Sequence, residues 1–350
     1  MSRFQESFEI AGLSVGCDAR CYVIAEAGAN HNRDIGIARE LIDVAADAGA
    51  DAVKFQTYRG ASLYSSKTPR FEYLDDDRTP QELLEAISLP PEWQAELIAH
   101  AHERGIAWFS TPFHEGAVDA LVEIGVPALK IASFEIVHLP LIRKAAESGL
   151  PLILSCGMTT YGEIEDALDA VAHGGGDRVA LLRCASLYPS PPQIMNLRAM
   201  ATMRAAFGVP VGLSDHTTGI SVPLGAAALG MHVLEKHFTL SRGMPGPDHP
   251  FAIEPDELRA LVTGIRAVEA SLGNGRLEGP SEAERKEMYT LARCSLIAAT
   301  DIPAGQPITR EMLAVKRPGY GIPPKQLERV IGRQARVDIA FDDIITWEMV

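Results

Sequence analysis

Residues 128–155 read ALKIASFEIVHLPLIRKAAESGLPLILS and contain the unit from which most of the chain is built. Two short apolar segments, residues 128–133 and 151–155, flank a segment with a helical pattern. Continuously apolar strands that are joined by a helix are typical of a parallel sheet covered on both faces. This stretch therefore predicts a strand, a crossover helix and a second, parallel strand.

The same alternation of strand and helix continues through most of the chain. The predicted strands are residues 21–26, 51–57, 106–111, 128–133, 151–155, 179–184, 211–214 and 233–237. Eight such units over about 250 residues favour an α/β fold, a closed (β/α)8 TIM barrel spanning residues 21–272. The alternative is an open, doubly wound sheet, but no glycine-rich dinucleotide-binding motif follows the first strand.

The flanking segments differ from the barrel in composition. We expect residues 1–20 to form an extension or a hairpin at the bottom of the barrel. Residues 273–290 are polar, charged and contain glycine, which is typical of a linker. Residues 291–350 have short β-prone runs between turn-like sequences, and they predict a small, mostly β second domain.

Composition limits the partners and the compartment. The chain has 350 residues and a formal net charge of −14, from 46 Asp and Glu against 32 Lys and Arg. That excess disfavours nucleic acids and anionic membranes, because binding a polyanion needs clustered cations. No apolar run approaches the roughly 20 residues that span a bilayer, and no signal peptide is visible. Five scattered cysteines form no disulfide framework, so we expect a cytoplasmic protein.

Polar side chains gather where the predicted strands end, and TIM barrels build their active sites at those ends. Buried polar groups without partners cost kilocalories each, so such a rim is not packed core. The residues at these ends are Glu26, Lys54, Gln56, Ser110, Thr111, Lys130, Ser133, Glu135, Ser155, Ser186, Tyr188, Ser214, Asp215, His216, Glu235, Lys236 and His237. We therefore predict an active site there.

Lys54 and Lys130 each lie within an apolar strand, so their ammonium groups point to the barrel mouth or extend past the barrel end. With nearby hydroxyl groups they form a cluster suited to a phosphate or a carboxylate. These hydroxyl groups belong to Ser133, Ser155, Ser186 and Ser214. A Schiff-base aldolase that uses Lys130 is the alternative.

His216 and His237 end the last two predicted strands, which are neighbours in a barrel. Two imidazoles on adjacent strand ends can share a divalent cation, with a carboxylate or water completing the shell. Glu135 is a candidate for facing this pair. A hydrogen-bonded structural histidine is the alternative for either residue, and His249 is a further histidine that could face the site.

Eight motifs are spread along the chain: IAEAGANHN (24–32), AGADAVKFQTY (48–58), FSTPF (109–113), KIASFE (130–135), GLSDHT (212–217), EKHFTL (235–240), PGPDH (245–249) and KRPGYG (316–321). Together they resemble the N-acetylneuraminate (sialic acid) synthase family, which includes pseudaminic and legionaminic acid synthases. The resemblance implies a TIM barrel followed by a small antifreeze-like (SAF) domain. It also implies a transferase that condenses phosphoenolpyruvate with an acylamino-hexose, giving a nine-carbon 2-keto sugar acid and phosphate.

The family resemblance implies roles for individual residues. Phosphoenolpyruvate would be held by Lys54, Thr111, Lys130, Ser133, Ser155, Ser186 and Ser214. The sugar would be held by Tyr188, Asp248 and Arg317. The catalytic residues would be Glu26, Lys54, Lys130 and Glu135, with Glu26 near the aldehyde. His216 and His237 would hold Mn2+ or Mg2+, with Co2+ as a substitute, to activate the aldehyde.

Three positions depart from the family pattern. Ser186 stands where asparagine is usual, Phe134 replaces a glycine, and Arg33 also occupies a position that is usually glycine. The SFE sequence at 133–135 is closer to pseudaminic acid synthases, whereas PGPDH is closer to the sialic and legionaminic branches. N-acetylmannosamine and a 2,4-diacetamido hexose, free or phosphorylated, therefore both stay open as the acceptor.

Arg317 lies in the turn-like sequence KRPGYG of the second domain, so it is displayed on a loop. In the family that this chain resembles, the C-terminal domain caps the barrel of the partner subunit. We therefore expect a domain-swapped homodimer in which each active site is shared between chains. A second domain that acts as an ice- or sugar-binding module is the non-enzymatic alternative.

Overall fold

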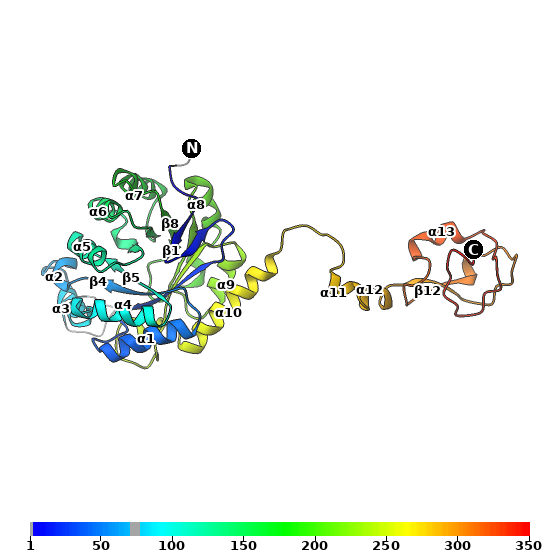
Figure 1. Ribbon diagram of the computed structural model, residues 1–350, viewed down its shortest axis with the longest axis horizontal. Coiled ribbons are helices and arrows are strands. Elements are labelled where there is room, and N and C mark those ends of the chain that lie inside the picture. The colour runs from blue at the N-terminus through cyan, green and yellow to red at the C-terminus, as the bar shows by residue number, and fades with distance from the viewer. Residues whose placement is uncertain (1–2, 71–77) are drawn as a thin grey trace. The chain divides into compact units, whose positions relative to one another are not determined.

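The computed structural model describes residues 3–70 and 78–350. It divides into two compact units, Met1–Gly273 and Asn274–Val350. The first unit is a closed barrel of parallel strands surrounded by helices (Figure 1). This arrangement confirms the predicted TIM barrel, and the open doubly wound sheet is wrong because the last strand pairs with the first.

The barrel strands follow one another around the ring in chain order. They are β3 (Tyr22–Gly28), β4 (Ala52–Thr57), β5 (Ala107–Pro112), β6 (Leu129–Ile131), β7 (Leu152–Cys156), β8 (Val179–Cys184), β9 (Val211–Asp215) and β10 (Val233–His237). Each strand pairs in parallel with its neighbours, and β10 pairs with β3 to close the ring. All the carboxyl ends therefore meet at one end of the barrel.

Helices cover the outside of the barrel. They are α1 (Ile35–Asp47), α4 (Gln94–Glu103), α5 (Glu115–Glu123), α6 (Leu139–Glu147), α7 (Tyr161–His173), α8 (Ala199–Phe207), α9 (Ser221–Ala228) and α10 (Pro255–Leu272). The connections add α2 (Gly60–Leu63), α3 (Pro80–Ile87) and the 3-10 helices η1 (Pro91–Trp93), η2 (Ser133–Glu135), η3 (Pro192–Ile194) and η4 (His249–Phe251). None of the helices in the described ranges is long and apolar enough to cross a membrane.

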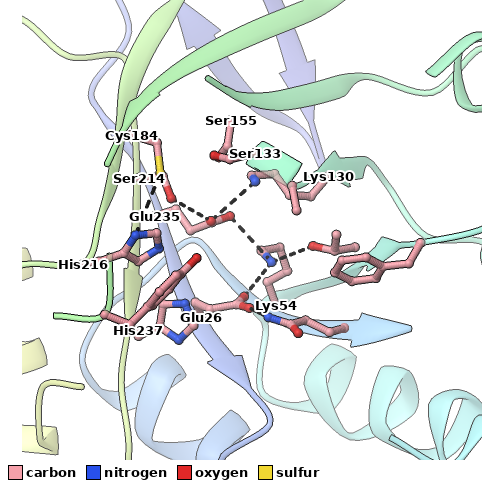
Figure 2. A pocket seen from close by; sticks show the side chains of 15 residues that line it. Glu26, Lys54, Lys130, Ser133, Ser155, Cys184, Ser214, His216, Glu235 and His237 are labelled. Atoms are coloured by element: carbon pink, nitrogen blue, oxygen red, sulfur yellow. Dashed lines mark hydrogen bonds and ion pairs between the residues drawn. The ribbon is translucent and has the colours of Figure 1, made fainter. Parts of the chain in front are cut away.

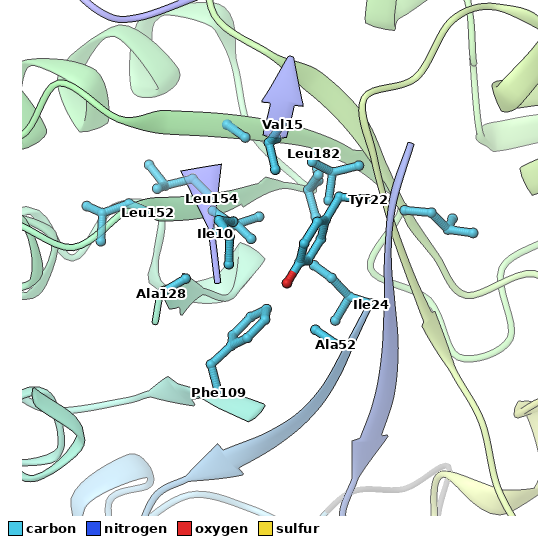
Figure 3. Close-up of a cluster of buried hydrophobic side chains, with 14 of the residues drawn as sticks. Ile10, Val15, Tyr22, Ile24, Ala52, Phe109, Ala128, Leu152, Leu154 and Leu182 are labelled. Carbon is cyan, nitrogen blue, oxygen red and sulfur yellow. The ribbon is translucent and has the colours of Figure 1, made fainter. Parts of the chain in front are cut away.

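The inside of the barrel is polar at one end and apolar at the other. The carboxyl ends of the strands surround a polar pocket (Figure 2), whereas Tyr22 and Leu152, at the amino ends, belong to a buried apolar cluster (Figure 3). Residues near the N-terminus form a hairpin of β1 (Ser7–Ile10) and β2 (Leu13–Gly16). Its Ile10 and Val15 are fully buried in the same apolar cluster. The carboxyl end is therefore the end left for function.

The second unit has its own apolar core and a small antiparallel sheet. Its elements are α11 (Glu282–Arg285), α12 (Met288–Leu291), β11 (Ser295–Ala298), η5 (Arg310–Met312), β12 (Leu313–Lys316), η6 (Pro324–Gln326) and α13 (Leu327–Val330). Among the short β-prone runs predicted in residues 291–350, residues 344–347 form no strand, and Ile344 makes one isolated antiparallel bridge to Ile297. The expected linker, residues 273–290, contains α11 and most of α12.

Candidate active site

The polar residues at the carboxyl ends of the strands converge on one pocket (Figure 2). Alternate residues of a strand point to the same side, which brings Ser214 and His216 to the pocket from the end of β9, and Glu235 and His237 from β10. The predicted site residues that line the pocket are Glu26, Lys54, Thr111, Lys130, Ser133, Ser155, Tyr188, Ser214, His216 and His237.

Glu235 lies at the centre of the pocket (Figure 2), although from the sequence it is only one of the strand-end residues and has no individual role. Its carboxylate is 3.7 Å from Lys54 Nζ and 3.5 Å from Lys130 Nζ. Ser214 Oγ also donates to it at 3.1 Å. The signal was present in the sequence, because Glu235 precedes His237 by two positions and therefore faces the same side of the strand.

The charges of the two lysines depend on their carboxylate partners. Lys54 Nζ lies 2.7 Å from Glu26 and donates to Thr111 Oγ1 at 2.8 Å. Burial opposes the charge on Lys54, but Glu235 and Glu26 outweigh it and raise the pKa of this lysine. Burial lowers the pKa of Lys130, and Glu235 offsets this only in part. Lys54 therefore stays protonated, and Lys130 is the lysine that loses its proton more readily.

Hydroxyl groups lie beside Lys130 in the pocket (Figure 2). Ser133 Oγ accepts a hydrogen bond from Gly157 N–H at 3.0 Å. Ser155 Oγ and Ser186 Oγ are buried and have no hydrogen-bond partner within the described ranges. A Cβ at Gly157 would lie 2.3 Å from Ser186 Oγ, so this close approach requires glycine. Free hydroxyl donors next to a lysine suit an anionic ligand.

His216 and His237 lie side by side, with ring centroids 5.4 Å apart. His216 Nδ1 donates to the Ala185 carbonyl at 2.8 Å, which leaves the Nε2 lone pair free. Burial lowers the pKa of His237 well below its usual range, and its buried Nδ1 has no hydrogen-bond partner among residues 3–70 and 78–350. Two such imidazoles fit a divalent cation.

No third His, Cys, Asp or Glu joins these histidines as a ligand cluster in the described part of the chain. Oxygen ligands from water or substrate would therefore have to complete the shell of a bound cation. Glu135 does not join the histidines as a ligand. Glu135 follows β6, four strands away from β10 in a ring of eight, and its charged neighbour is Lys130.

Glu26 and Glu135 are the two predicted catalytic carboxyl groups. Burial raises the pKa of Glu26 to about 7, although Lys54 acts in the opposite direction. Gln56 also donates to Glu26 at 2.9 Å. Burial likewise raises the pKa of Glu135 to about 7, and Lys130 opposes this rise. Carboxyl groups with such pKa values can both give and accept protons at neutral pH.

The predicted sugar-binding residues fall into two groups. The ring of Tyr188 lies 4.2 Å from that of His216, and Asp248 Oδ2 lies 3.8 Å from His237 Nδ1. Asp248 therefore lies next to His237, which lines the pocket, whereas Ser186 and Glu135 are not among the lining residues. Arg317 belongs to the second unit, where it is exposed directly after β12.

Known proteins share both parts of this architecture. Residues 41–277 match the NeuB family, and residues 293–350 match the SAF domain. The N,N'-diacetyllegionaminic acid synthase of Campylobacter jejuni is 40% identical over 329 residues, covering 92% of this chain and 98% of that protein. The pseudaminic acid synthase of Helicobacter pylori is 36% identical over 318 residues, covering 89% and 93%. The crystal structure of N-acetylneuraminic acid synthetase from Leptospira borgpetersenii, in complex with citrate, superposes with a TM-score of 0.72 at 35% identity, covering 81% of this chain and 95% of that one.

Proposed function

Because the chain belongs to the NeuB family, whose members listed above synthesise sialic-type (nonulosonic) acids, we propose that it condenses phosphoenolpyruvate with an acylamino-hexose. The products are a nonulosonic acid and phosphate. One observation carries this proposal: a single pocket has lysines and free hydroxyl groups on one side and two histidines on the other. The first side suits a phosphorylated carboxylate, and the second suits an aldehyde that must be polarised.

The lysine side holds phosphoenolpyruvate in this proposal. Lys54 and Lys130 supply charge-assisted hydrogen bonds to its phosphate and carboxylate. The remaining donors are the hydroxyl groups of Thr111, Ser133, Ser155, Ser186 and Ser214. Glu235 lies between the lysines and balances their charge until the substrate anion binds.

The histidine side holds the divalent cation. His216 and His237 would bind Mn2+ or Mg2+, with Co2+ as a substitute, since imidazole with oxygen ligands suits these ions. Such a cation would act as a Lewis acid on the aldehyde oxygen. The chain orients the rings: the Ala185 carbonyl fixes the tautomer of His216, and Tyr188 packs against the same ring.

The proposed reaction balances with one water molecule. C3 of phosphoenolpyruvate attacks the aldehyde carbon, water adds at C2, and phosphate leaves by cleavage of the C–O bond. One proton of the water ends on the former aldehyde oxygen and the other on phosphate. Glu26 and Glu135, each with a pKa of about 7, are the carboxyl groups that give and accept these protons.

A panel of acceptors tests this function and identifies the sugar. Phosphate release is measured with phosphoenolpyruvate and either N-acetylmannosamine, its 6-phosphate or a 2,4-diacetamido hexose. The 40% identity to a legionaminic acid synthase supports including the diacetamido sugar alongside N-acetylmannosamine. Phosphate release that depends on one of these acceptors supports the proposal. If none of the sugars stimulates phosphate release, the proposal is contradicted.

A domain-swapped homodimer is the second part of the proposal. Exposed apolar side chains lie on three neighbouring connections at the carboxyl end of the barrel, after β6, β7 and β8, namely Phe134 (52% exposed), Met158 (69%) and Leu187 (53%). Such a patch marks an interaction surface. We propose that the second domain of another copy covers it and brings Arg317 to the sugar.

Mixing two inactive variants tests the swap. Arg317→Ala subunits retain an intact barrel, and His216→Ala subunits retain an intact second domain. In a swapped dimer, half of the mixed dimers' sites combine the two intact parts, so exchange at equal amounts should restore about a quarter of wild-type activity. No recovery after confirmed subunit exchange would show that the second domain does not act on the partner.

A Schiff-base aldolase that uses Lys130 is the alternative, because burial lowers the pKa of this lysine. Borohydride trapping in the presence of a keto acid substrate distinguishes the two. The synthase proposal predicts no adduct on Lys130 and loss of activity with a chelator. An adduct on Lys130 together with activity that survives the chelator would favour the aldolase.

A further inference from the structure

His249 is completely buried beside the pocket, and the proposed reaction gives it no role. It begins η4, in the connection that follows β10 and also carries Asp248. The base of this connection is closed where Thr239 N–H donates to the Ile253 carbonyl at 2.9 Å. His249 is therefore buried within this loop, and the residue before it, Asp248, lies near His237.

Both ring nitrogens of His249 have partners. Thr239 Oγ1 lies 2.6 Å from Nδ1, and Asn32 Oδ1 lies 3.2 Å from Nε2. The amide oxygen can only accept, so Nε2 carries the hydrogen and Nδ1 is an acceptor; the Thr239 hydroxyl lies within reach of both Nδ1 and, at 3.2 Å, the Ser241 carbonyl. Burial lowers the pKa of His249, which favours this neutral form. The ring thus bridges its own loop and the loop after β3.

The loop after β3 is shaped for this bridge. Asn32 has a φ of +49°, in the left-handed region that asparagine tolerates better than most residues. Asn30 Nδ2 donates to the Phe238 carbonyl at 2.8 Å and ties the same loop to the end of β10. A Cβ at Gly246, whose φ is +145°, would lie 2.8 Å from His249 Cδ2 and 3.2 Å from Asn32 Oδ1. Glycine is therefore needed for the ring to reach Asn32.

We propose that His249 is a positioning residue that pins the Asp248 loop to the loop after β3. The consequence is a fixed Asp248 carboxylate: Oδ2 lies 3.8 Å from His237 Nδ1, and a Cβ at Gly28 would lie only 2.9 Å from it. That carboxylate lies on the histidine side of the pocket, where the acceptor sugar binds if the proposed function holds. The bridge itself rests on the contacts of the ring alone.

Two substitutions at one position test the bridge. His249→Leu removes both hydrogen bonds, whereas His249→Gln retains an amide that can reach Asn32. With His249→Leu, we expect faster hydrogen exchange in residues 238–254 and a KM for the acceptor raised about tenfold, with the KM for phosphoenolpyruvate within about twofold. His249→Gln should reverse most of both effects. Gly246→Ala should resemble His249→Leu, because its methyl group displaces the ring.

His232→Leu is the matched control. It also removes a buried histidine, but one whose Nδ1 accepts from Val211 N–H at 3.1 Å at the amino end of β10. It should lower stability without changing the exchange of residues 238–254 or either KM. Unchanged exchange in His249→Leu would overturn the proposal, and so would an equal rise in both KM values. If the wild type uses no acceptor, the proposed function fails, and loop exchange alone then decides the bridge.

Discussion

Glu235→Gln removes one negative charge from the centre of the pocket and keeps the size of the side chain. In the wild type, the carboxylate lies 3.5 Å from Lys130 Nζ and 3.7 Å from Lys54 Nζ. At an effective dielectric constant of about 20, each pair contributes an attraction of about 4–5 kcal/mol. Desolvation of the buried carboxylate offsets several kcal/mol of that sum. We therefore expect the free energy of unfolding to fall by about 3–5 kcal/mol.

Phosphoenolpyruvate should reverse part of this loss, because its own negative groups replace the missing carboxylate. The repulsion between Glu235 and the substrate also disappears. We expect the variant to bind phosphoenolpyruvate about tenfold more tightly, equivalent to about 1.4 kcal/mol. Saturating substrate should therefore raise the unfolding free energy of the variant more than that of the wild type.

The stability difference between Glu235→Gln and the wild type should also depend on pH. The pKa of Lys130 is already lowered in the folded state, and loss of Glu235 lowers it further. A lysine whose pKa is lower in the folded state than in the unfolded state lowers the free energy of unfolding, and this penalty is complete at pH values below its folded-state pKa. The penalty disappears as the pH approaches about 10.4, where the unfolded chain also loses the proton. The deficit of the variant should therefore shrink as the pH rises towards about 10.4.

Urea unfolding with and without phosphoenolpyruvate measures these effects. Glu147→Gln is the control, because this exposed carboxylate, 3.5 Å from Arg143, should contribute no more than about 0.5 kcal/mol. A Glu235→Gln protein that is as stable as the wild type and binds phosphoenolpyruvate more weakly would refute the reasoning. Glu235 would then contribute to substrate binding and not balance the charge of the lysines.

Further substitutions test the anion-binding lysines, the metal site and the buried Lys236–Asp215 pair. Lys54→Ala and Lys130→Ala should each raise the KM for phosphoenolpyruvate about ten- to a hundredfold, far more than the KM for the sugar; equal effects on both would contradict separate subsites. His216→Ala should abolish turnover and weaken Mn2+ binding measured by electron paramagnetic resonance, yet leave phosphoenolpyruvate binding intact. If this variant turned over at the wild-type rate in chelator-treated buffer, the metal site would be refuted. Lys236→Met should lower the free energy of unfolding by about 3–5 kcal/mol, because it leaves buried Asp215, 2.6 Å from Lys236 Nζ, without its counter-ion. Adding Asp215→Leu should recover most of that loss in urea unfolding. A double variant no more stable than the single one would contradict this.

The barrel could be predicted because its strands are apolar throughout and follow in chain order. The convergence of the site residues could also be predicted, since parallel strands place their carboxyl ends together. Period-two alternation alone brings Ser214 and His216 to the end of the strand that begins at residue 211, and Glu235 and His237 to the end of the strand at residues 233–237.

Distances across the ring could not be predicted in this way. The position of Glu235 between two lysines depends on the register that places Glu235 beside Ser214. Chain order places β6 opposite β10, but it does not give the distance across the ring between Glu135 and the histidines. The bridge from His249 to Asn32 joins residues 217 positions apart and requires a left-handed turn that no local pattern signals.

The central claim is a condensation with cleavage of the C–O bond, and an isotope label tests it most directly. Phosphoenolpyruvate carrying oxygen-18 between C2 and phosphorus is incubated with the enzyme, a divalent cation and the accepted sugar. The account predicts the label in the released phosphate, an unlabelled C2 carbonyl in the nonulosonic acid, and no release without the sugar. Label retained in the keto acid, or labelled phosphate released equally without the sugar, would contradict it.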